Sequence, residues 1–576
     1  MKKNRNILLT FLQYLKPYTG RLMIILGLIT LASAGTLASP YILKVIIDDI
    51  FPSKDFQGLI NILIVLVSIN IMRIGVQILS DYLHDWVSGR IIMDIRSDLF
   101  SHILRLPTQF FGETKKGDII QRLGHEVDMI EQAMTGSAIR FVYNVLTILG
   151  LGVALSWLNF ELFLISITVM PFIYFNIRYF EPRIRNAAEK LRSKEGDFTA
   201  FMLERLENIE LLKGLNKQPE EVEELKDKSR SIIKSSLKET ILGSANGGVT
   251  TFLISLTPII IFGWSGKSVM NDTMTVGALI AFLQYLNRLF GPFRDLMRLY
   301  LELIQTKASM KRVFEYLELA TDENEVIRED KASFDYEITF RDISFSHNDK
   351  PLINHLNLTL KKGNKYALVG KSGSGKSSLI KMLCHFNKPV TGQILLDNKD
   401  LASWEIPAAR ALFGHLGQNH QFYNDSILNN LRYGNKEANL SAIYKVTKIT
   451  GVYPDIIKLP AGFETNMGDQ GLKLSGGQKQ LIATSRLLLT DKEVLIFDEA
   501  TSALDSHKDE LLWNQLLETY SQKTIIAISH RLSTIKKFDT IICLHEGKIV
   551  ETGTHDQLIS NQSYYFELVK DQLVFA

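Results

Sequence analysis

The residues best suited to chemistry lie in the stretch GKSGSGKSS, which runs from Gly370 to Ser378. This stretch follows the short β-rich run KYALVG and precedes SLIKMLCHF, a run typical of a helix. In a strand–loop–helix segment of this kind, glycines let backbone N–H groups turn inward around phosphates, and the helix N-terminus favours negative charge. Lys376 can then reach the β- and γ-phosphates of a nucleotide, and the Ser377 hydroxyl can ligate Mg²⁺. The stretch therefore predicts a P-loop.

A carboxylate for magnesium is expected at the end of a neighbouring buried strand. In the run EVLIFDEAT, Asp498 and Glu499 directly follow the apolar residues Val494–Phe497. Alone, this pattern is also typical of a strand capped by solvated acids, but the P-loop upstream favours a functional site. We expect Asp498 to hold the Mg²⁺ shell and Glu499 to orient or deprotonate the attacking water. A lone histidine is usually structural, but His530 ends another buried run, TIIAISH, where it can sense the γ-phosphate.

A second element that suits phosphate is LSGGQ, from Leu474 to Gln478. A serine followed by two glycines before a helical run is typical of a helix N-terminus that binds an anion. The chain thus carries two phosphate-seeking elements but only one nucleotide-binding pattern.

The elements that must carry these motifs differ sharply between the two parts of the chain. After about residue 320, short strand-like runs alternate with helical ones, whereas the first part holds long apolar runs of the kind that span membranes, which need about 17–25 residues. Five runs have no charged residue: Leu22–Leu43, Phe56–Met72, Phe141–Phe160, Leu162–Ile177 and Ile241–Gly266. The sixth, Thr273–Asn287, is short because Arg288 follows it. Buried helices of a soluble core are the alternative, but six such runs favour membrane spans.

Basic residues predict the orientation of these spans. They are frequent in the N-terminal stretch and between spans two and three, whereas the opposite loops carry only Lys54 and Lys267. Since cytoplasmic loops carry the excess of Lys and Arg, both termini and the two long loops are expected in the cytosol. Those loops are charged and helix-compatible, which predicts that the spans continue as helices beyond the bilayer.

Composition excludes little else. The net charge of +3 gives no indication of a nucleic-acid partner. The two cysteines, Cys384 and Cys543, can form neither a disulfide framework nor a recognised metal pattern, so they are expected to be reduced thiols.

Taken together, the P-loop, LSGGQ and LIFDE resemble the motifs of ATP-binding cassette (ABC) proteins, and the six-span half resembles the membrane domain of ABC exporters. The resemblance covers essentially the whole chain. It implies an α-helical membrane domain over residues 1–320, fused to an α/β P-loop NTPase domain of ABC type over residues 321–576. Spans are then expected near residues 22–46, 56–80, 138–158, 160–180, 242–266 and 273–298.

The resemblance also assigns roles to matching positions. ATP would be bound by the Walker A residues Gly370, Ser372, Gly373, Ser374, Gly375, Lys376, Ser377 and Ser378, by the signature residues Ser475, Gly476, Gly477 and Gln478, and by Asp505 of the D-loop. Mg²⁺ would be held by Ser377, Asp498 and the Q-loop residue Gln418. The catalytic residues would be Glu499, His530 and Gln418. Tips near Phe111–Lys116 and Leu206–Leu215 resemble the coupling helices that dock on nucleotide-binding domains.

The activity implied is ATP-driven export across the cytoplasmic membrane, or between its leaflets, by a homodimer; a peptide, an amphipathic drug or a lipid would each fit as substrate. A head-to-tail pair explains the two phosphate-seeking elements, because Ser475 and Gly477 of one chain would close over the γ-phosphate in the P-loop of the other. One alternative is an ATP-gated channel or sensor on the same scaffold, against which the intact Glu499 argues. The other is one half of a heterodimeric exporter, in which a silent half would normally show a spoiled motif.

Three positions depart from the family pattern. His347 stands where a tyrosine normally stacks on adenine, and its smaller ring predicts weaker or less base-selective ATP binding. Asp469 and Gln470 stand where exporters usually have Glu and Arg, so contact with the coupling helices is expected to differ in detail. Leu481 replaces a second basic residue and is expected to be a surface difference.

Arginines within the spans are the best clue to the substrate. Arg73, Arg140 and Arg288 are costly at membrane depth unless they face a cavity or a partner. They either pair or reach the interface, or they form a basic cavity that favours a substrate with an anionic group, such as a carboxylate or lipid headgroup. A self-paired stripe is expected at the spacing i, i+4, i+8 for Arg294, Arg298 and Glu302.

Overall fold

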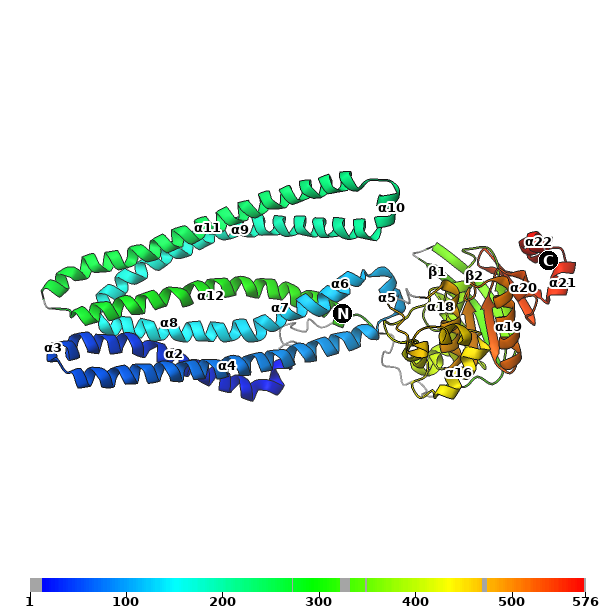
Figure 1. Cartoon of the computed structure of the whole chain (residues 1–576), viewed down its shortest axis with the longest axis horizontal. Coiled ribbons are helices and arrows are strands. Elements are labelled where there is room, and N and C mark those ends of the chain that lie inside the picture. The colour runs from blue at the N-terminus through cyan, green and yellow to red at the C-terminus, as the bar shows by residue number, and fades with distance from the viewer. Residues whose placement is uncertain (1–12, 272, 322–331, 348–349, 469–473, 574–576) are drawn as a thin grey trace. The chain divides into compact units, whose positions relative to one another are not determined.

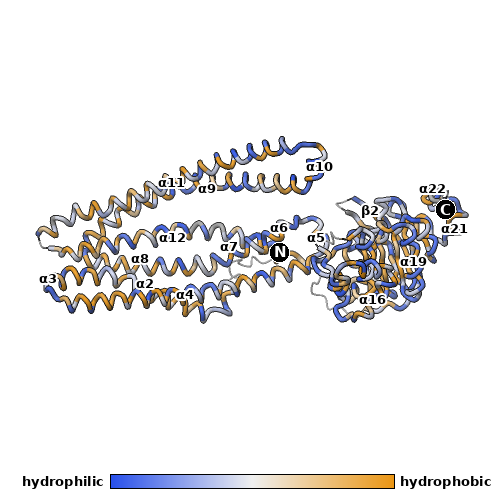
Figure 2. Tube along the Cα trace, in the orientation of Figure 1, coloured by the Kyte–Doolittle hydropathy of each residue, from blue (hydrophilic) through white to orange (hydrophobic). Residues whose placement is uncertain are grey.

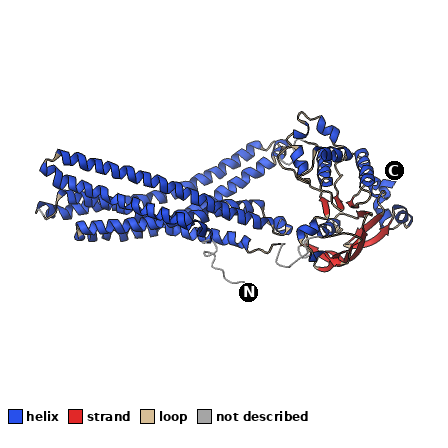
Figure 3. Cartoon of the chain, turned by 90° about the horizontal axis from the view of Figure 1, so that it is seen from below, coloured by secondary structure: helices blue, strands red, loops and turns tan. Residues whose placement is uncertain are grey.

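The computed structural model describes residues 13–271, 273–321, 332–347, 350–468 and 474–573. The chain forms two compact units. The helical unit holds residues 1–100 and 120–318, and the α/β unit holds residues 101–119 and 319–576. Figure 3 shows the strands confined to the α/β unit.

The helical unit is built on long helices: α2 (Thr19–Val45), α4 (Phe56–Leu104), α8 (Ala138–Leu158), α9 (Phe160–Glu207), α11 (Gln218–Met270) and α12 (Val276–Leu317). The 53 residues of α11 span about 80 Å at 1.5 Å per residue, against a hydrocarbon core about 30 Å thick. The helices therefore extend well beyond the bilayer, as the charged loops predicted. Figure 2 shows hydrophobic residues concentrated in the part of this unit that carries α3 (Phe51–Ser53).

Five helical stretches in the described part of the chain are long and apolar enough to cross a membrane: Gln13–Ser53, Phe56–Leu104, Lys116–Leu158, Phe160–Glu207 and Gln218–Met270. They contain the first five predicted spans. The sixth predicted span, near 273–298, lies on α12, which does not reach this threshold because Gln284, Asn287 and Arg288 interrupt its apolar residues. It stays a prediction.

Short elements join the long helices. They are η1 (Gln13–Tyr18), η2 (Ile46–Ile50), α5 (Thr108–Glu113), α6 (Lys116–Gln121), η3 (Arg122–Glu126), α7 (Val127–Glu131), η4 (Gln132–Ser137) and α10 (Ile209–Gly214). Thus a short helix, α5 or α10, occurs at each predicted cytosolic tip. Side-chain oxygens cap two long helices: Asn159 accepts the N–H of Leu162 at 3.0 Å, and Thr275 accepts that of Ala278 at 3.2 Å.

The helices of this unit pack in two groups. Helices α9 and α11 run antiparallel as a pair joined by α10, while α2, α8 and α12 pack on one another (Figure 1). Asn176 on α9 donates to the Asn246 side-chain oxygen on α11 at 2.9 Å, which fixes the register of the pair. A buried cluster that includes Leu151, Phe282 and Leu286 forms the core around α8 and α12.

The α/β unit contains two sheets. The four-stranded sheet has the order β2-β1-β4-β5, with β1 (Glu337–His347), β2 (Lys350–Lys361), β4 (Thr391–Leu396) and β5 (Lys399–Asp400). The six-stranded sheet has the order β10-β9-β3-β8-β7-β6, with β3 (Lys365–Val369), β6 (Phe413–Leu416), β7 (Val494–Asp498), β8 (Thr524–Ile528), β9 (Thr540–His545) and β10 (Lys548–Gly553). All but β10 are parallel in this second sheet.

The parallel strands of the six-stranded sheet are buried on both faces, whereas the edge strand β10 is partly exposed. Alternate residues, such as Phe497 and Ile496 of β7, belong to two different hydrophobic clusters. This burial explains why the strands are continuous apolar runs in the sequence.

The helices of this unit are α13 (Lys376–Leu383), α14 (Ile406–Arg410), α15 (Ile427–Arg432), α16 (Leu440–Ile449), α17 (Tyr453–Ile457), α18 (Gly476–Leu488), α19 (Ser506–Thr519), α20 (Leu532–Ile535), α21 (His555–Ser560) and α22 (Tyr564–Leu573), with short turns η5 (Leu401–Ser403) and η6 (Gly462–Glu464).

The segment 101–119, which carries α5, belongs to the α/β unit although it lies within the sequence of the membrane half. The hydroxyl of Thr108 at the start of α5 donates to the carbonyl of Phe386 at 2.7 Å. One predicted tip therefore contacts the α/β unit directly. The domain boundary at residue 320 stays a prediction.

Candidate functional site

The P-loop lies between the carboxyl end of β3 and the start of α13, at the centre of the parallel sheet. Its backbone turns sharply, with positive φ angles at Gly373 (80°) and Gly375 (102°), where a side chain would be strained. A Cβ on Gly370 would lie only 2.2 Å from the carbonyl oxygen of Leu544. These glycines allow the loop to curl tightly against β9.

Two polar groups point into this loop. Lys376 is buried, and its ammonium donates to the carbonyls of Gly370 at 2.8 Å and Lys371 at 3.0 Å. Burial lowers the pKa of Lys376, against the opposing attraction of Glu499 and Asp498. The Ser374 hydroxyl is buried without a hydrogen-bond partner among the described residues. An orphaned hydroxyl and a buried ammonium in a glycine cradle fit a phosphate group.

The acid at the end of β7 lies against α13. Asp498 is buried, and its Oδ1 accepts a hydrogen bond from the Ser377 hydroxyl at 3.2 Å. Burial raises the pKa of Asp498, although the Ser377 hydrogen bond and nearby lysines oppose this shift. The structure thus brings Ser377 and Asp498, predicted as Mg²⁺ ligands, into direct contact.

Glu499, which follows β7, contacts residues that follow the two neighbouring strands, β6 and β8, at the same edge of the sheet. Its Oε2 accepts from the Gln418 amide, which follows β6, at 3.0 Å, and its Oε1 lies 3.2 Å from Nε2 of His530, which follows β8. Glu499 has a φ of 52°, a left-handed conformation that is uncommon for a non-glycine residue. Such strained conformations concentrate at functional sites, where the surrounding structure holds them in place. The predicted catalytic residues therefore form one hydrogen-bonded group.

The LSGGQ residues form a different hollow, with a volume of about 500 Å³. Ser475 caps α18, where its hydroxyl accepts the N–H of Gln478 at 3.3 Å and the Gln478 side chain accepts the N–H of Ser475 at 3.1 Å. Asp505, which caps α19, lines the same hollow, and the backbone N–H of Lys508 lowers its pKa. The residues that line this hollow include none from Gly370 to Ser378.

The three departures have different outcomes. His347 is the last residue of β1 and pairs with Lys350 of β2, and its expected effect on ATP binding stays a prediction. Asp469 and Gln470 lie outside the described residues. Leu481 is buried, with 3% of its surface exposed, so the expectation of a surface difference was wrong: this position faces the core on α18, where a basic side chain would be costly.

Known proteins match the chain along most of its length. A model described as ABC transporter transmembrane region matches residues 22–293, and one described as ABC transporter matches residues 353–502. The putative multidrug export ATP-binding/permease protein YgaD of Bacillus subtilis is 30% identical over 569 residues, which cover 97% of this chain and 98% of that protein. The chain belongs to the ABC exporter family.

Two further matches agree with this assignment. An ATP-dependent lipid A-core flippase of Thiobacillus denitrificans is 30% identical over 98% of each chain. The solved structure of a bacterial Atm1-family ABC exporter with ATP bound has a TM-score of 0.82 at 25% identity, and it covers 96% of this chain and 98% of that one. This ABC exporter is therefore a multi-pass membrane protein whose ATPase domain binds ATP and drives transport.

The membrane half of the exporter has a basic cavity, but its arginines differ from the predicted set. A cavity of about 570 Å³ is lined by Arg73, Arg288 and Arg294, with Asp295 as an acidic neighbour. Arg288 also donates to the carbonyl of Thr36.

Arg140 lies elsewhere and lines a separate hollow. It donates to Oε2 of Glu302 at 2.8 Å, and the Ser137 hydroxyl donates to the same oxygen at 2.7 Å. The expected stripe of Arg294, Arg298 and Glu302 was therefore wrong, because Glu302 pairs with α8 rather than along its own helix. Pairing within the bundle accounts for Arg140, whereas Arg73 and Arg288 share a cavity.

Sequence reasoning missed residues that link the Glu499–His530 group to the hollow around Ser475. Arg531, next to His530, donates to the carbonyls of Leu504 at 2.6 Å and Ser502 at 3.2 Å. Gln480 on α18 accepts the N–H of Ala503 at 2.9 Å. The segment before Asp505 is thus held both from the His530 side and from the LSGGQ helix. The only sequence signal was the position of Arg531 directly after the predicted γ-phosphate sensor.

Proposed function

We propose that the exporter works as a pair of identical subunits, with ATP and Mg²⁺ held between the P-loop of one subunit and the LSGGQ residues of the other. The observation that carries this proposal is the separate hollow around Ser475, which is lined by none of the P-loop residues. The first backbone N–H groups of an α-helix lack intrahelical partners and favour anions. At α18, those of Gly476 and Gly477 therefore suit a phosphate supplied from outside their own chain.

The residues at the P-loop fit Mg²⁺ as well as ATP. Ser377, Asp498 and the amide oxygen of Gln418 are oxygen donors, which magnesium prefers. When bound, the ion would neutralise charge that develops on the transferred phosphoryl group. Glu499 would accept a proton from the attacking water, while the Gln418 and His530 side chains that contact it would hold its carboxylate in place.

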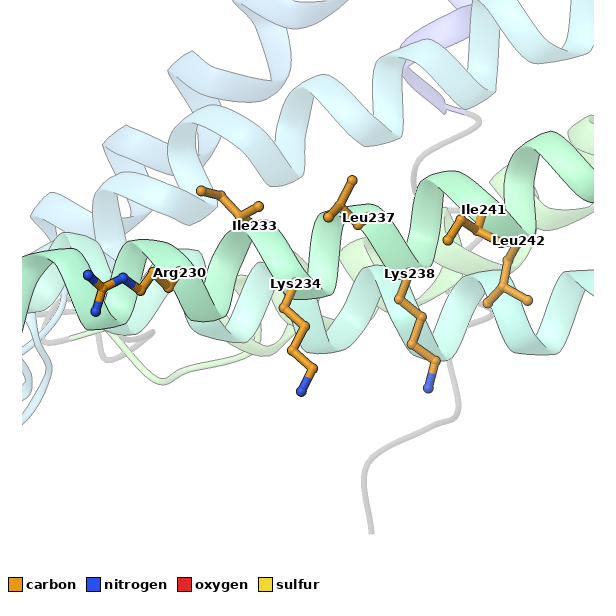
Figure 4. A pocket seen from close by; sticks show the side chains of 7 residues that line it. All are labelled: Arg230, Ile233, Lys234, Leu237, Lys238, Ile241 and Leu242. Atoms are coloured by element: carbon orange, nitrogen blue, oxygen red, sulfur yellow. The ribbon is translucent and has the colours of Figure 1, made fainter.

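The exporter is proposed to lie in the cytoplasmic membrane with both termini and the ATPase domain in the cytosol. A shallow groove on α11 supports this orientation. It contains Arg230, Lys234 and Lys238 at a spacing of four residues, just before the uncharged run that begins at Thr240. Figure 4 shows Lys234 and Lys238 extending from the same side of the helix. Basic residues next to a span favour the cytosolic side.

The substrate is proposed to be an amphipathic molecule with an anionic group. Arg73, Arg288 and Arg294 around one cavity support this, since positive charge beside a membrane cavity needs a partner. Two of the matched relatives are named as a multidrug export protein and a lipid A-core flippase, so a drug and a lipid would each fit as the substrate.

Cross-linking between subunits tests the paired arrangement. Both native cysteines are buried, so introduced cysteines can be labelled selectively. Exporters with Ser372→Cys and Ser475→Cys on differently tagged chains would be treated with a bis-maleimide in lipid vesicles. We expect ATP with vanadate to give a product of twice the 65.4 kDa chain mass that carries both tags.

The matched control replaces the second site by Ser560→Cys, an exposed serine on α21. It should give little product, and ATP should not change that amount. A Ser372–Ser475 reaction confined to single chains, or one that is independent of nucleotide, would rule out the paired site.

A further inference from the structure

The chain passes between the two units three times. It leaves the helical unit after Phe100, returns at Ile120 and leaves again after Glu318. The first two crossings flank α5, whose Thr108 contacts Phe386, and the third leads into the ATPase domain. Any movement of the α/β unit must reach the membrane helices through these three connections or through surface contacts.

An arginine lies close to each crossing; one of the three lies in a short segment that the other two contact. They are Arg96, Arg122 and Arg312. The junction segment, Arg122–Asp128, consists of the π-helical turn η3 and the first residues of α7. Single π-helical turns are rare in proteins, and those that do occur are often found at functional sites.

The first tie joins the end of α4 to the junction segment. Arg96 donates from Nε to the carbonyl of Leu123 at 3.0 Å and from Nη2 to Oδ1 of Asp128 at 2.6 Å. One guanidinium thus holds both the backbone and a side chain of this segment. It lies about one turn before the first crossing.

The second tie joins the junction segment to the end of α12. Arg312 donates from Nε to Oε1 and from Nη2 to Oε2 of Glu126, both at 2.8 Å. The Glu126 side chain is only 3% exposed. Paired parallel hydrogen bonds of this kind fix orientation as well as distance, because the guanidinium and carboxylate planes must align.

Arg122 adds a third contact to the same helix end. It donates to the carbonyl of Arg312, and its guanidinium stacks 3.8 Å from the ring centre of Tyr316. Helix α12 also packs against η3 and α7, where Val127, Ile130 and Val313 are fully buried. Hydrogen bonds from the arginines, around a buried apolar core, therefore hold the end of α4, the junction segment and the end of α12 together.

We propose that Glu126 and Arg312 are positioning residues: together with Arg96 on α4, they bind the three crossings to one another, so that ATP-driven movement of the α/β unit reaches the membrane helices as a single displacement. Neither residue contacts the nucleotide groups described above. Their loss should therefore leave hydrolysis in place and weaken its coupling to the transport pathway.

The test compares hydrolysis with movement in one preparation. Thr36 lines the basic cavity of the helical unit, and in a Thr36→Cys background the two native cysteines are buried. In lipid vesicles, the rate at which a membrane-impermeant maleimide labels this cysteine would be measured without nucleotide and after trapping with ATP and vanadate. Basal ATPase activity and thermal stability would be measured on the same samples.

We expect Glu126→Gln/Arg312→Gln to reduce the nucleotide-dependent change in labelling rate by about fivefold or more, with basal ATPase within about twofold of the parent. Lys311→Gln, which removes an exposed charge next to Arg312, is the matched control and should behave like the parent. A double variant with the full labelling change would overturn the proposal.

Arg96→Gln keeps the test decisive where the double variant is destabilised. It removes the guanidinium contacts with the Leu123 carbonyl and with the half-exposed Asp128, and it leaves the Glu126–Arg312 pair intact. We expect a smaller but measurable loss of the labelling change, again without loss of ATPase activity. Equal loss of labelling change and ATPase activity in a stable Arg96→Gln variant would also overturn the proposal, because it would indicate a general effect on the fold.

Discussion

Acid should weaken the ATPase domain through one buried histidine. His415 lies on β6, where its ring packs edge-on against Phe386, with ring centres 5.9 Å apart. Its Nε2 is buried with no hydrogen-bond partner in the described part of the chain. Burial, with a smaller contribution from the charge of Lys381, lowers the pKa of His415 from 6.5 to about 4.

The sign and the size of the effect follow from linkage. Because the unfolded chain binds a proton on His415 more readily than the folded one, this contribution to stability is complete above about pH 6.5 and is lost as the pH falls toward 4. At pH 5 the loss is about 2 kcal/mol relative to pH 7.5. For a domain of this size, that corresponds to a fall of about 4–8 °C in Tm.

The measurement is the pH dependence of Tm, followed by calorimetry on the whole exporter in detergent at pH 7.5 and pH 5. The fall in Tm between pH 7.5 and pH 5 should be about 4–8 °C smaller in His415→Asn than in the parent. This difference does not depend on how much the substitution lowers Tm at pH 7.5. His507→Asn, which replaces an exposed histidine on α19, should leave the fall unchanged. An equal pH dependence in His415→Asn and the parent would refute this account of the burial.

Two further predictions concern the membrane half. Arg288→Gln should reduce the stimulation of ATPase activity by anionic amphiphiles and leave the stimulation by cationic amphiphiles unchanged. Arg298→Gln, on the same helix but outside the cavity, should change neither. An unchanged preference for anionic amphiphiles in Arg288→Gln would contradict an anionic substrate. Asp48→Asn should cost about 1 kcal/mol of unfolding free energy, because Asp48 accepts the N–H of Gly277 at 2.8 Å and the hydroxyl of Thr275 at the start of α12. Chemical denaturation in detergent should show this loss, with exposed Asp49→Asn as the near-neutral control, and equal effects of both would argue against the cap.

The arrangement of the proposed ATP site was the most predictable part of the molecule from sequence. Its residues follow buried strands directly, so a pattern such as LIFDE specifies both the strand and the edge at which Asp498 and Glu499 emerge. Parallel order then brings Gln418 and His530 to the same edge, although they are far apart in the chain. What sequence could not give was the contact between these groups or the strained φ of Glu499, because both depend on the packing of neighbouring strands.

Side chains on long helices were harder to predict. Spacing along α12 suggested that Glu302 would pair with Arg298, whereas it pairs with Arg140 on α8. Arg298 and Arg140 could each neutralise the carboxylate of Glu302, and only the rotation of one helix against another decides which arginine pairs with it. Leu481 was mistaken for a surface residue for the same reason: the face of α18 that meets the core is set by its neighbours, not by the motif that starts it.

This difference in predictability corresponds to a difference in expected function. Groups fixed by strand ends, such as Asp498 and Glu499, are proposed to act on the nucleotide itself, so their loss should stop hydrolysis and transport together. The Glu126–Arg312 pair is fixed only by helix packing and lies outside the nucleotide site, so its loss should separate the two activities. An exporter needs both kinds of residue, because hydrolysis supplies free energy locally while transport requires that a distant part of the chain move with it. The separation of ATPase activity from cavity movement is therefore the property by which the junction segment can be distinguished from the catalytic site.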